Sequence, residues 1–220
     1  KGFHNDCYES KPDLIIIANA LTGVDFCEAN PSLAESINVK GTKNIVDGCK
    51  SVNSKLVFIS TSAVFNGTKS EYSENDKPNP TGIYGLTKFQ GEKIIQESNL
   101  PFLILRTDQP YCWKEKWQHT NSVIRVIENL EKNQQFKEVV DWYNTPTYVP
   151  DFVNATKELI QKDLEGTVIE HVDNQVLFTY SSEKQLLKNT IMMGYRNYNA
   201  DNMFAVRIED IENFEYHCKN

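Results

Sequence analysis

Residues 78–92 read PNPTGIYGLTKFQGE, and this is the most informative stretch of the chain. Two prolines and a glycine keep its first residues out of a helix. Apolar residues then recur at helical spacing: Leu86, Phe89, Ile94 and Ile95. We therefore predict a helix that starts near Tyr84, which places Tyr84 and Lys88 on one face of it.

A phenol with an ammonium group beside it can act as an acid at neutral pH. The cation favours the phenolate and so lowers the pKa of the phenol. This is the chemistry that delivers a proton to a carbonyl oxygen. A Tyr-x-x-x-Lys spacing alone is more often an ordinary surface pair, so the assignment depends on the rest of the chain.

Short apolar runs on either side of this stretch have the composition of buried parallel strands. They occupy residues 12–18, 55–60 and 102–106. Between the first two, Asn30 is a predicted N-cap with Pro31 at the first helical position, and the helix ends near Lys50. One face of this helix, which we expect to be the buried one, carries Leu33, Ala34, Ile37, Gly41, Ile45 and Val46. A polar loop over 66–82 precedes the Tyr84 helix. The predicted fold class is α/β, a doubly wound parallel sheet of the Rossmann type with a small α/β lid on the substrate side.

The second half of the chain is more polar and less regular. Helices are predicted near 122–130 and 151–162, and strands near 136–140 and 166–172. No periodicity is apparent after residue 193. We expect a Rossmann-like cofactor domain over 1–110 with parts of 135–175, and a smaller substrate-side region over most of 111–220, without a fixed boundary.

Small and hydroxylated residues follow each of the three predicted strands: 18–20 (ANA), 60–63 (STSA) and 106–108 (RTD). Ligands of such sheets bind at the carboxyl ends of the strands. Thr61 and Ser62 are therefore candidates to hold the carbonyl that Tyr84 protonates. The alternative is that both are turn or cap hydroxyls, which are common after a strand.

Composition excludes several classes of function. The formal net charge is -7 and the pI is near 5.2, which argues against nucleic acid or an anionic membrane as the main partner. No apolar run reaches membrane-spanning length and no signal peptide is recognisable, so we expect a cytoplasmic protein. The cysteines have no metal-type or disulfide-type spacing, and neither have the histidines. We expect no metal site.

Five segments together, in this order, resemble the extended short-chain dehydrogenase/reductases, and among them most of all the dTDP-4-dehydrorhamnose reductase family. They are 11–16 (KPDLII), 22–25 (TGVD) with Cys27-Glu28, 37–42 (INVKGT), 59–67 (ISTSAVFNG) and 83–88 (IYGLTK). The likeness covers roughly 11–159, and 145–149 (TPTYV) extends it into the substrate-side region.

The resemblance implies roles for individual residues. Tyr84 would be the proton donor, Lys88 would bind the nicotinamide ribose, and Thr61 would hydrogen-bond the reacting carbonyl, with Asn38 in support. The implied cofactor is NADPH or NADH, held by Ala18, Asn19, Ala20, Leu21, Ser60, Tyr84 and Lys88. The implied substrate contacts are Thr61, Ser62, Thr107, Gln109 and Trp142.

The sequence departs from the family in two ways. It contains no Gly-x-x-Gly-x-x-Gly turn of the kind that binds the cofactor pyrophosphate, and its first strand corresponds to a later strand of the family. Either an upstream segment carries that turn, which we expect, or the protein does not bind a dinucleotide in the usual way. Several residues also differ from the family pattern, which leaves the substrate open: Asn19, Ser62, Gln109, Trp142 and Asn144.

The resemblance thus predicts an NAD(P)H-dependent reductase of a 4-keto nucleotide sugar. An epimerase or dehydratase of the same superfamily, with tightly held NAD, shares the same residues and stays open. So does a non-catalytic regulatory subunit like the beta subunit of methionine adenosyltransferase. The expected ligand is a nucleotide sugar, and a homodimer is also considered.

Overall fold

The computed structural model describes residues 10–69, 72, 76–113, 120–134, 145–162, 167–172 and 190–194. The chain divides into two compact units. The first comprises residues 1–107, 162–170 and 178–192, and the second comprises 108–161, 171–177 and 193–220.

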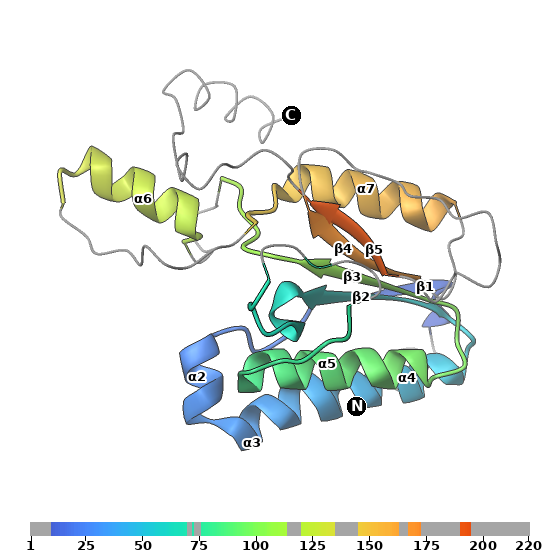
Figure 1. Cartoon of the computed structure of the whole chain (residues 1–220). Helices are drawn as coiled ribbons and strands as arrows, with labels where there is room; N and C mark the ends of the chain where they lie inside the picture. Colours follow the sequence, from blue (N-terminus) through green and yellow to red (C-terminus); the bar gives the residue numbers. More distant parts are fainter. Residues whose placement is uncertain are drawn as a thin grey trace. The chain divides into compact units, whose positions relative to one another are not determined.

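Five strands form one sheet in the order β1-β2-β3-β4-β5 (Figure 1). They are β1 (Leu14–Ile17), β2 (Lys55–Thr61), β3 (Phe102–Thr107), β4 (Thr167–Val172) and β5 (Thr190–Gly194). The pairs β1–β2, β2–β3 and β3–β4 are parallel, which confirms the predicted α/β sheet and its first three strands. The predicted strand at 166–172 is β4, whereas β5 was not predicted. Thr61 pairs with Thr107, so the carboxyl ends of β2 and β3 lie side by side.

The helices of the first unit precede and follow β2. They are α2 (Val24–Ala29), α3 (Pro31–Ala34), the π-helix η1 (Glu35–Lys40), α4 (Gly41–Lys50), the 3₁₀ turn η2 (Ser62–Val64) and α5 (Ile83–Gln96). Residues 31–50 are helical throughout, as predicted, but the π-helix and α2 were not foreseen. Figure 1 shows α4 and α5 side by side along one face of the sheet.

Two details of the predicted 31–50 helix are wrong. Asn30 makes no capping bond; its side-chain amide instead donates to the Phe26 carbonyl at 3.0 Å, because α2 ends directly before it. Leu33 was expected on the buried face but is 43% exposed. A π-turn holds more residues than an α-turn, so a face extrapolated at α-helical spacing does not continue across η1.

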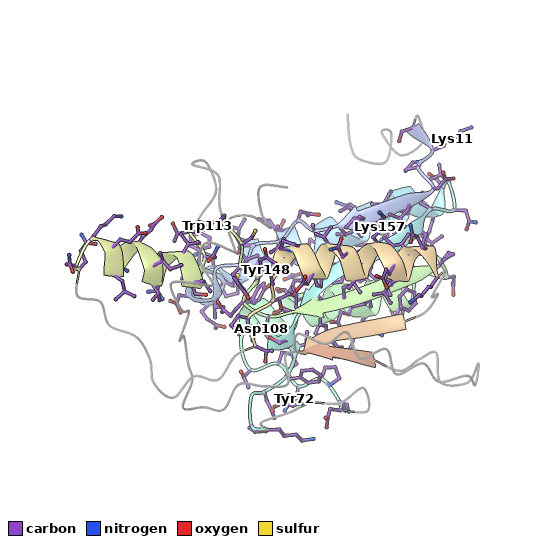
Figure 2. The ribbon with its side chains drawn as sticks, turned by 90° about the horizontal axis from the view of Figure 1, so that it is seen from above. Lys11, Tyr72, Asp108, Trp113, Tyr148 and Lys157 are labelled. Atoms are coloured by element: carbon purple, nitrogen blue, oxygen red, sulfur yellow. The ribbon has the colours of Figure 1, made fainter. Side chains whose placement is uncertain are left out.

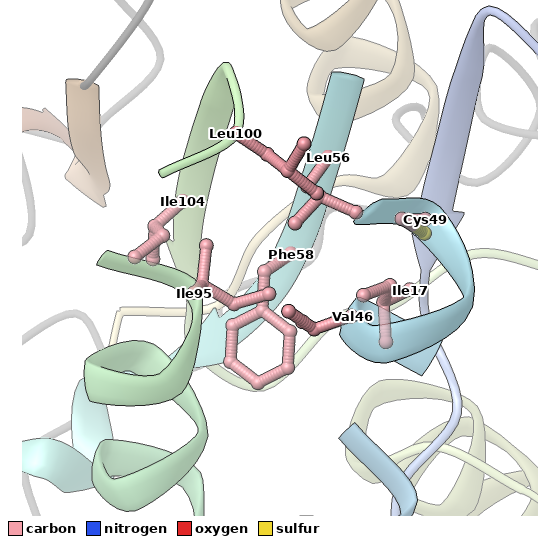
Figure 3. Packing of buried hydrophobic residues seen from close by; sticks show 8 residues of the cluster. All are labelled: Ile17, Val46, Cys49, Leu56, Phe58, Ile95, Leu100 and Ile104. Atoms are coloured by element: carbon pink, nitrogen blue, oxygen red, sulfur yellow. The ribbon is translucent and has the colours of Figure 1, made fainter. Parts of the chain in front are cut away.

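The core of the first unit lies between the sheet and the α4–α5 pair (Figure 3). Its buried members are Ile17, Val46, Cys49, Leu56, Phe58, Ile95, Leu100 and Ile104. Each fully buried aliphatic or aromatic side chain contributes about 1.5–3 kcal/mol of transfer free energy. Burial of Ile95 in this cluster fixes α5 against the sheet.

The loop between β2 and α5 is anchored where the structure describes it. The Tyr72 ring stacks on Phe65 with 4.3 Å between centroids, and its hydroxyl donates to the Asn66 side-chain oxygen at 2.6 Å. Figure 2 labels Tyr72 in this loop. The backbone N–H of Asn79 donates to the Val64 carbonyl at 2.9 Å, which returns the chain to the end of β2 before α5 begins.

The second unit contains α6 (Ser122–Glu131) and α7 (Val149–Gln161), close to the two helices predicted there. Its segments 108–113 and 145–149 run alongside each other. Tyr111 and Tyr148 form a parallel bridge, and Asp108 accepts the N–H of Thr145 on its carboxylate at 2.9 Å. Figure 2 labels Asp108, Trp113 and Tyr148 of this unit. The predicted strand at 136–140 lies outside the described residues.

Among the described residues, no helix has both the length and the apolar character needed to span a membrane.

Candidate active site

The helix α5 carries Tyr84 and Lys88 in its first turns, as the sequence predicted. It begins at Ile83, directly after the extended residue Gly82. The Glu28 carboxylate of α2 accepts the N–H of Ile83 at 2.6 Å. A carboxylate at this end complements the positive pole of the helix and satisfies one of its free N–H groups. The start of α5 is therefore fixed by a neighbouring helix.

A close backbone contact brings the start of α5 against the end of β2. A Cβ atom on Gly85 would lie 2.1 Å from the carbonyl oxygen of Ala63, so only glycine permits this approach. Thr61 ends β2, and its hydroxyl accepts the N–H of Ala63 at 3.2 Å. Thr61 thus caps η2, one of the two roles predicted for it. Because the hydroxyl accepts in this bond, its own hydrogen remains able to donate to a ligand.

Lys88 is a buried cation. Its residue is 3% exposed, and its ammonium donates to the Ile59 carbonyl at 2.7 Å and lies 4.1 Å from the centroid of the Phe58 ring. Burial lowers the pKa of Lys88 from 10.5 to about 8, and the charge of Glu92 partly opposes this shift. Lys88 therefore remains mostly charged at pH 7 and becomes neutral in mildly alkaline solution.

Asn38 ties the loop after β1 to α5. This residue of η1 is 2% exposed. Its side chain accepts the N–H of Leu21 at 2.7 Å and donates both to the Leu21 carbonyl at 3.1 Å and to the Thr87 hydroxyl at 3.0 Å. Ala18 and Asn19, in the loop that this clamp holds, are exposed. Asn38, the predicted supporting residue, thus joins the predicted cofactor loop to α5, the helix that carries Tyr84.

A buried ion pair, which sequence reasoning missed, lies one turn beyond Lys88. The Arg106 guanidinium of β3 binds both oxygens of Glu92, at 2.8 and 2.7 Å, and the Ser60 hydroxyl donates to Glu92 at 2.6 Å. Ser60 was predicted to bind cofactor, but its hydroxyl is engaged inside the protein. A signal was present: Arg106 interrupts an apolar strand, and a buried arginine needs a partner of opposite charge.

The predicted substrate residues do not all lie in the same unit of the chain. Thr107 lies beside Thr61 across the sheet, and within the described part of the chain its buried hydroxyl has no hydrogen-bond partner. Ser62 opens η2 and is half-buried. Gln109 belongs to the second unit, where its side-chain oxygen accepts from the Ser122 hydroxyl at 3.3 Å. Trp142 and Asn144 lie outside the described residues.

Replacing Lys88 by methionine is expected to stabilise the fold. The lowered pKa corresponds to a penalty of about 3 kcal/mol for the charged form, since one pKa unit is about 1.4 kcal/mol. The penalty applies in full below pH 8 and disappears as pH rises through the interval from 8 to 10.5. Lys88→Met should therefore exceed the parent in free energy of unfolding at pH 7, and by less at alkaline pH.

Urea unfolding at several pH values would measure this difference. Lys93→Met is the matched control, because Lys93 is an exposed lysine on the same helix that lies over Phe89 at 4.6 Å. It should change stability little at any pH. A Lys88→Met protein that is less stable than the parent at pH 7 would show that the hydrogen bond to Ile59 outweighs the cost of burial.

Known proteins are similar to this chain in sequence and in fold. A family model described as "RmlD substrate binding domain" matches residues 2–190. Methionine adenosyltransferase 2 subunit beta of Bos taurus is 28% identical over 186 residues, 84% of this chain and 54% of that protein. The dTDP-4-dehydrorhamnose reductase of Aggregatibacter actinomycetemcomitans is 31% identical over 163 residues, 73% of this chain and 54% of that protein. The chain thus spans about half the length of these curated relatives.

Among solved structures, dTDP-4-dehydrorhamnose reductase from Bacillus anthracis strain Ames, in complex with NADP, has a TM-score of 0.70 at 33% identity, over 76% of this chain and 58% of that one. The reductase from Clostridium acetobutylicum has a TM-score of 0.66 at 34% identity, over 73% and 56%. These matches confirm the Rossmann-like fold and the resemblance found in the sequence: the chain belongs to the RmlD substrate-binding domain family, whose relatives include the dTDP-4-dehydrorhamnose reductases.

Proposed function

We propose that the protein reduces a 4-keto nucleotide sugar with NADPH or NADH, and that Tyr84 donates the proton. The observation that carries this proposal is the backbone contact between Gly85, next to Tyr84 in α5, and Ala63, two residues after Thr61. The buried ammonium of Lys88 is one helical turn away on the same face. An acid, a hydroxyl donor and a cation are the groups that carbonyl reduction requires.

In this proposal three side chains take part in the reduction. The Thr61 hydroxyl donates a hydrogen bond to the substrate carbonyl and holds it in position. The Tyr84 hydroxyl gives its proton to that oxygen as negative charge develops there. The Lys88 ammonium stabilises the resulting phenolate. Bound NAD(P)H would supply the hydride, so the protein provides position, a proton and charge.

The residues present fit the nicotinamide end of such a cofactor. Ala18 and Asn19 are exposed at the carboxyl end of β1, in a loop that Asn38 fixes. The small side chain of Ala18 allows a flat ring to approach, and Lys88 can donate to ribose hydroxyls. The solved reductase from Bacillus anthracis, described in complex with NADP, supports the assignment by its likeness to this chain.

Calorimetric titration of the full-length protein tests the proposal. NADPH or NADH is expected to bind at about micromolar Kd, the order common for enzyme ligands. A panel of nucleotide sugars is then titrated into the cofactor-loaded protein. The resemblance to the reductases implies a tryptophan where this chain has Gln109, so we expect dTDP-4-dehydrorhamnose to bind less tightly than another keto sugar nucleotide. Absence of binding by both dinucleotides would refute the proposal.

A regulatory subunit is the second candidate. Its support is the likeness to methionine adenosyltransferase 2 subunit beta, which extends over more of this chain than that of the curated reductase. An epimerase or dehydratase with bound NAD is the third. The outcomes separate them: a protein that turns over no nucleotide sugar but binds a methionine adenosyltransferase catalytic subunit is regulatory. One that converts a nucleotide sugar without consuming added NAD(P)H is an epimerase or dehydratase.

A further inference from the structure

The environment of Lys88 comes from two adjacent residues of β2. The strand offers the Ile59 carbonyl, 2.7 Å from the ammonium, and the face of the Phe58 ring, whose centroid is 4.1 Å from it. An aromatic face carries partial negative charge and attracts a cation, most strongly where water is excluded. With Phe58 fully buried and Lys88 3% exposed, this contact is desolvated.

The Phe58 ring is held in place by its surroundings. It belongs to the hydrophobic core of the first unit, where Figure 3 shows it between Ile95 and Val46. On α5, a Cβ atom at Gly91 would lie 2.8 Å from Cζ of the ring, so the absence of a side chain at Gly91 leaves the space that the ring occupies. The same helix thus brings Lys88 to the ring and makes room for the ring.

We propose that Phe58 is a positioning residue for Lys88: its ring face, fixed by the core and by Gly91, holds in its charged form the ammonium of a residue one helical turn from Tyr84. The consequence for catalysis rests on the proposed function, but the placement of the cation does not. Without the ring, the amine would be more readily neutral and less able to stabilise the phenolate of Tyr84.

Few other charges act on Lys88. On its own helix, Glu92 favours the charged form, and Glu92 is itself paired with Arg106 of β3. Among the described residues of β2, α3 and η2, the only charged one is Lys55. It lies at the start of β2, whereas Lys88 contacts Phe58 and Ile59 further along the strand. In α2, η1 and α4 the described charged side chains are exposed or paired at the surface, as in Lys40–Glu35 and Lys43–Asp47. The neutral groups that favour the cation are therefore the Ile59 carbonyl and the Phe58 ring, and the ring is the one that a side-chain substitution can change.

The test replaces Phe58 by mono-, di- and trifluorophenylalanine, which withdraw charge from the ring face while changing its volume little. The protonation of Lys88 is followed by NMR of lysine labelled with ¹³C at Cε, across pH 6–11. We expect the ratio of neutral to charged Lys88 to rise about tenfold over the series. The matched control fluorinates Phe89 and follows exposed Lys93, where a change below about twofold is expected.

Phe58→Met provides a second variant, because methionine fills core space without presenting a ring. It should shift Lys88 toward the neutral amine by a similar factor. A ratio at Lys88 that moves no more than that of Lys93, in both Phe58→Met and the fluorinated series, would overturn the inference. If the ratio moves as expected but the parent protein itself reduces no keto nucleotide sugar, the role of Phe58 is supported and the proposed function is refuted.

Discussion

Tyr84→Phe is expected to lower the rate of carbonyl reduction by about two to four orders of magnitude, the contribution of a positioned general acid. The change removes one oxygen from a half-buried side chain at the start of α5. Three contacts of other residues fix this helix: Glu28 at its N-terminus, Gly85 against Ala63, and Ile95 in the core. The fold and the binding of cofactor should therefore persist.

Single-turnover rates with NADPH and a keto nucleotide sugar would measure the loss, and thermal unfolding would verify the fold. Tyr72→Phe is the matched control, since it also removes one phenolic oxygen from the first unit, at a hydroxyl bound to Asn66 in the surface loop. It should leave the rate within about twofold. Near-parental turnover by the Tyr84→Phe protein would eliminate Tyr84 as the proton donor.

Among glycine-to-alanine changes in the first unit, Gly85→Ala is expected to lower the stability of the fold the most. The added Cβ would lie 2.1 Å from the Ala63 oxygen and 2.9 Å from the Ala63 carbonyl carbon. Both are backbone atoms of η2, so they cannot rotate away as a side chain would. Overpacking costs about 1–3 kcal/mol or more, whereas alanine in place of helical glycine returns about 1 kcal/mol. We expect a net loss of stability and a displaced Tyr84.

Gly41→Ala is the matched control, because it replaces a helical glycine by alanine without the cost of overpacking. Gly41 is also helical, but its nearest neighbour beyond the helix's own adjacent turn is the Ser36 oxygen at 3.8 Å, an ordinary contact. This variant should gain stability by about 0.5–1 kcal/mol in chemical denaturation. If Gly85→Ala gained stability as Gly41→Ala does, the close approach of α5 to the end of β2 would be disproved.

The elements around the site were predictable because their apolar residues follow regular patterns in the sequence. Continuous apolar runs indicated β1, β2 and β3, and the recurrence of Leu86, Phe89 and Ile95 indicated α5. Periodicity reports which face of an element is apolar. It does not report where a backbone departs from α-geometry, which is why η1 and the loss of the Asn30 cap were missed.

The candidate site was predictable only in part. Tyr84, Lys88 and Thr61 bear chemistry that a sequence displays. The close approach of α5 to Ala63, two residues after Thr61, depends on Gly85, which contributes by having no side chain. The pairing of Glu92 with Arg106 joins a helix to a strand, and no local pattern records such a partnership. The ring of Phe58 under Lys88 was hidden for the same reason, because a core phenylalanine looks like any other in an apolar strand.

The π-helix η1 has a consequence for how this chain is aligned with its relatives. Its bonds span five residues instead of four, so residues 35–40 hold one residue more than an α-helix of equal length would. A homologue with an uninterrupted α-helix here would need one residue fewer between the same two ends. Alignments across residues 31–50 should therefore permit a one-residue gap within 35–40 and be anchored on Asn38, whose bonds to Leu21 and Thr87 define its equivalent, instead of on the helix termini.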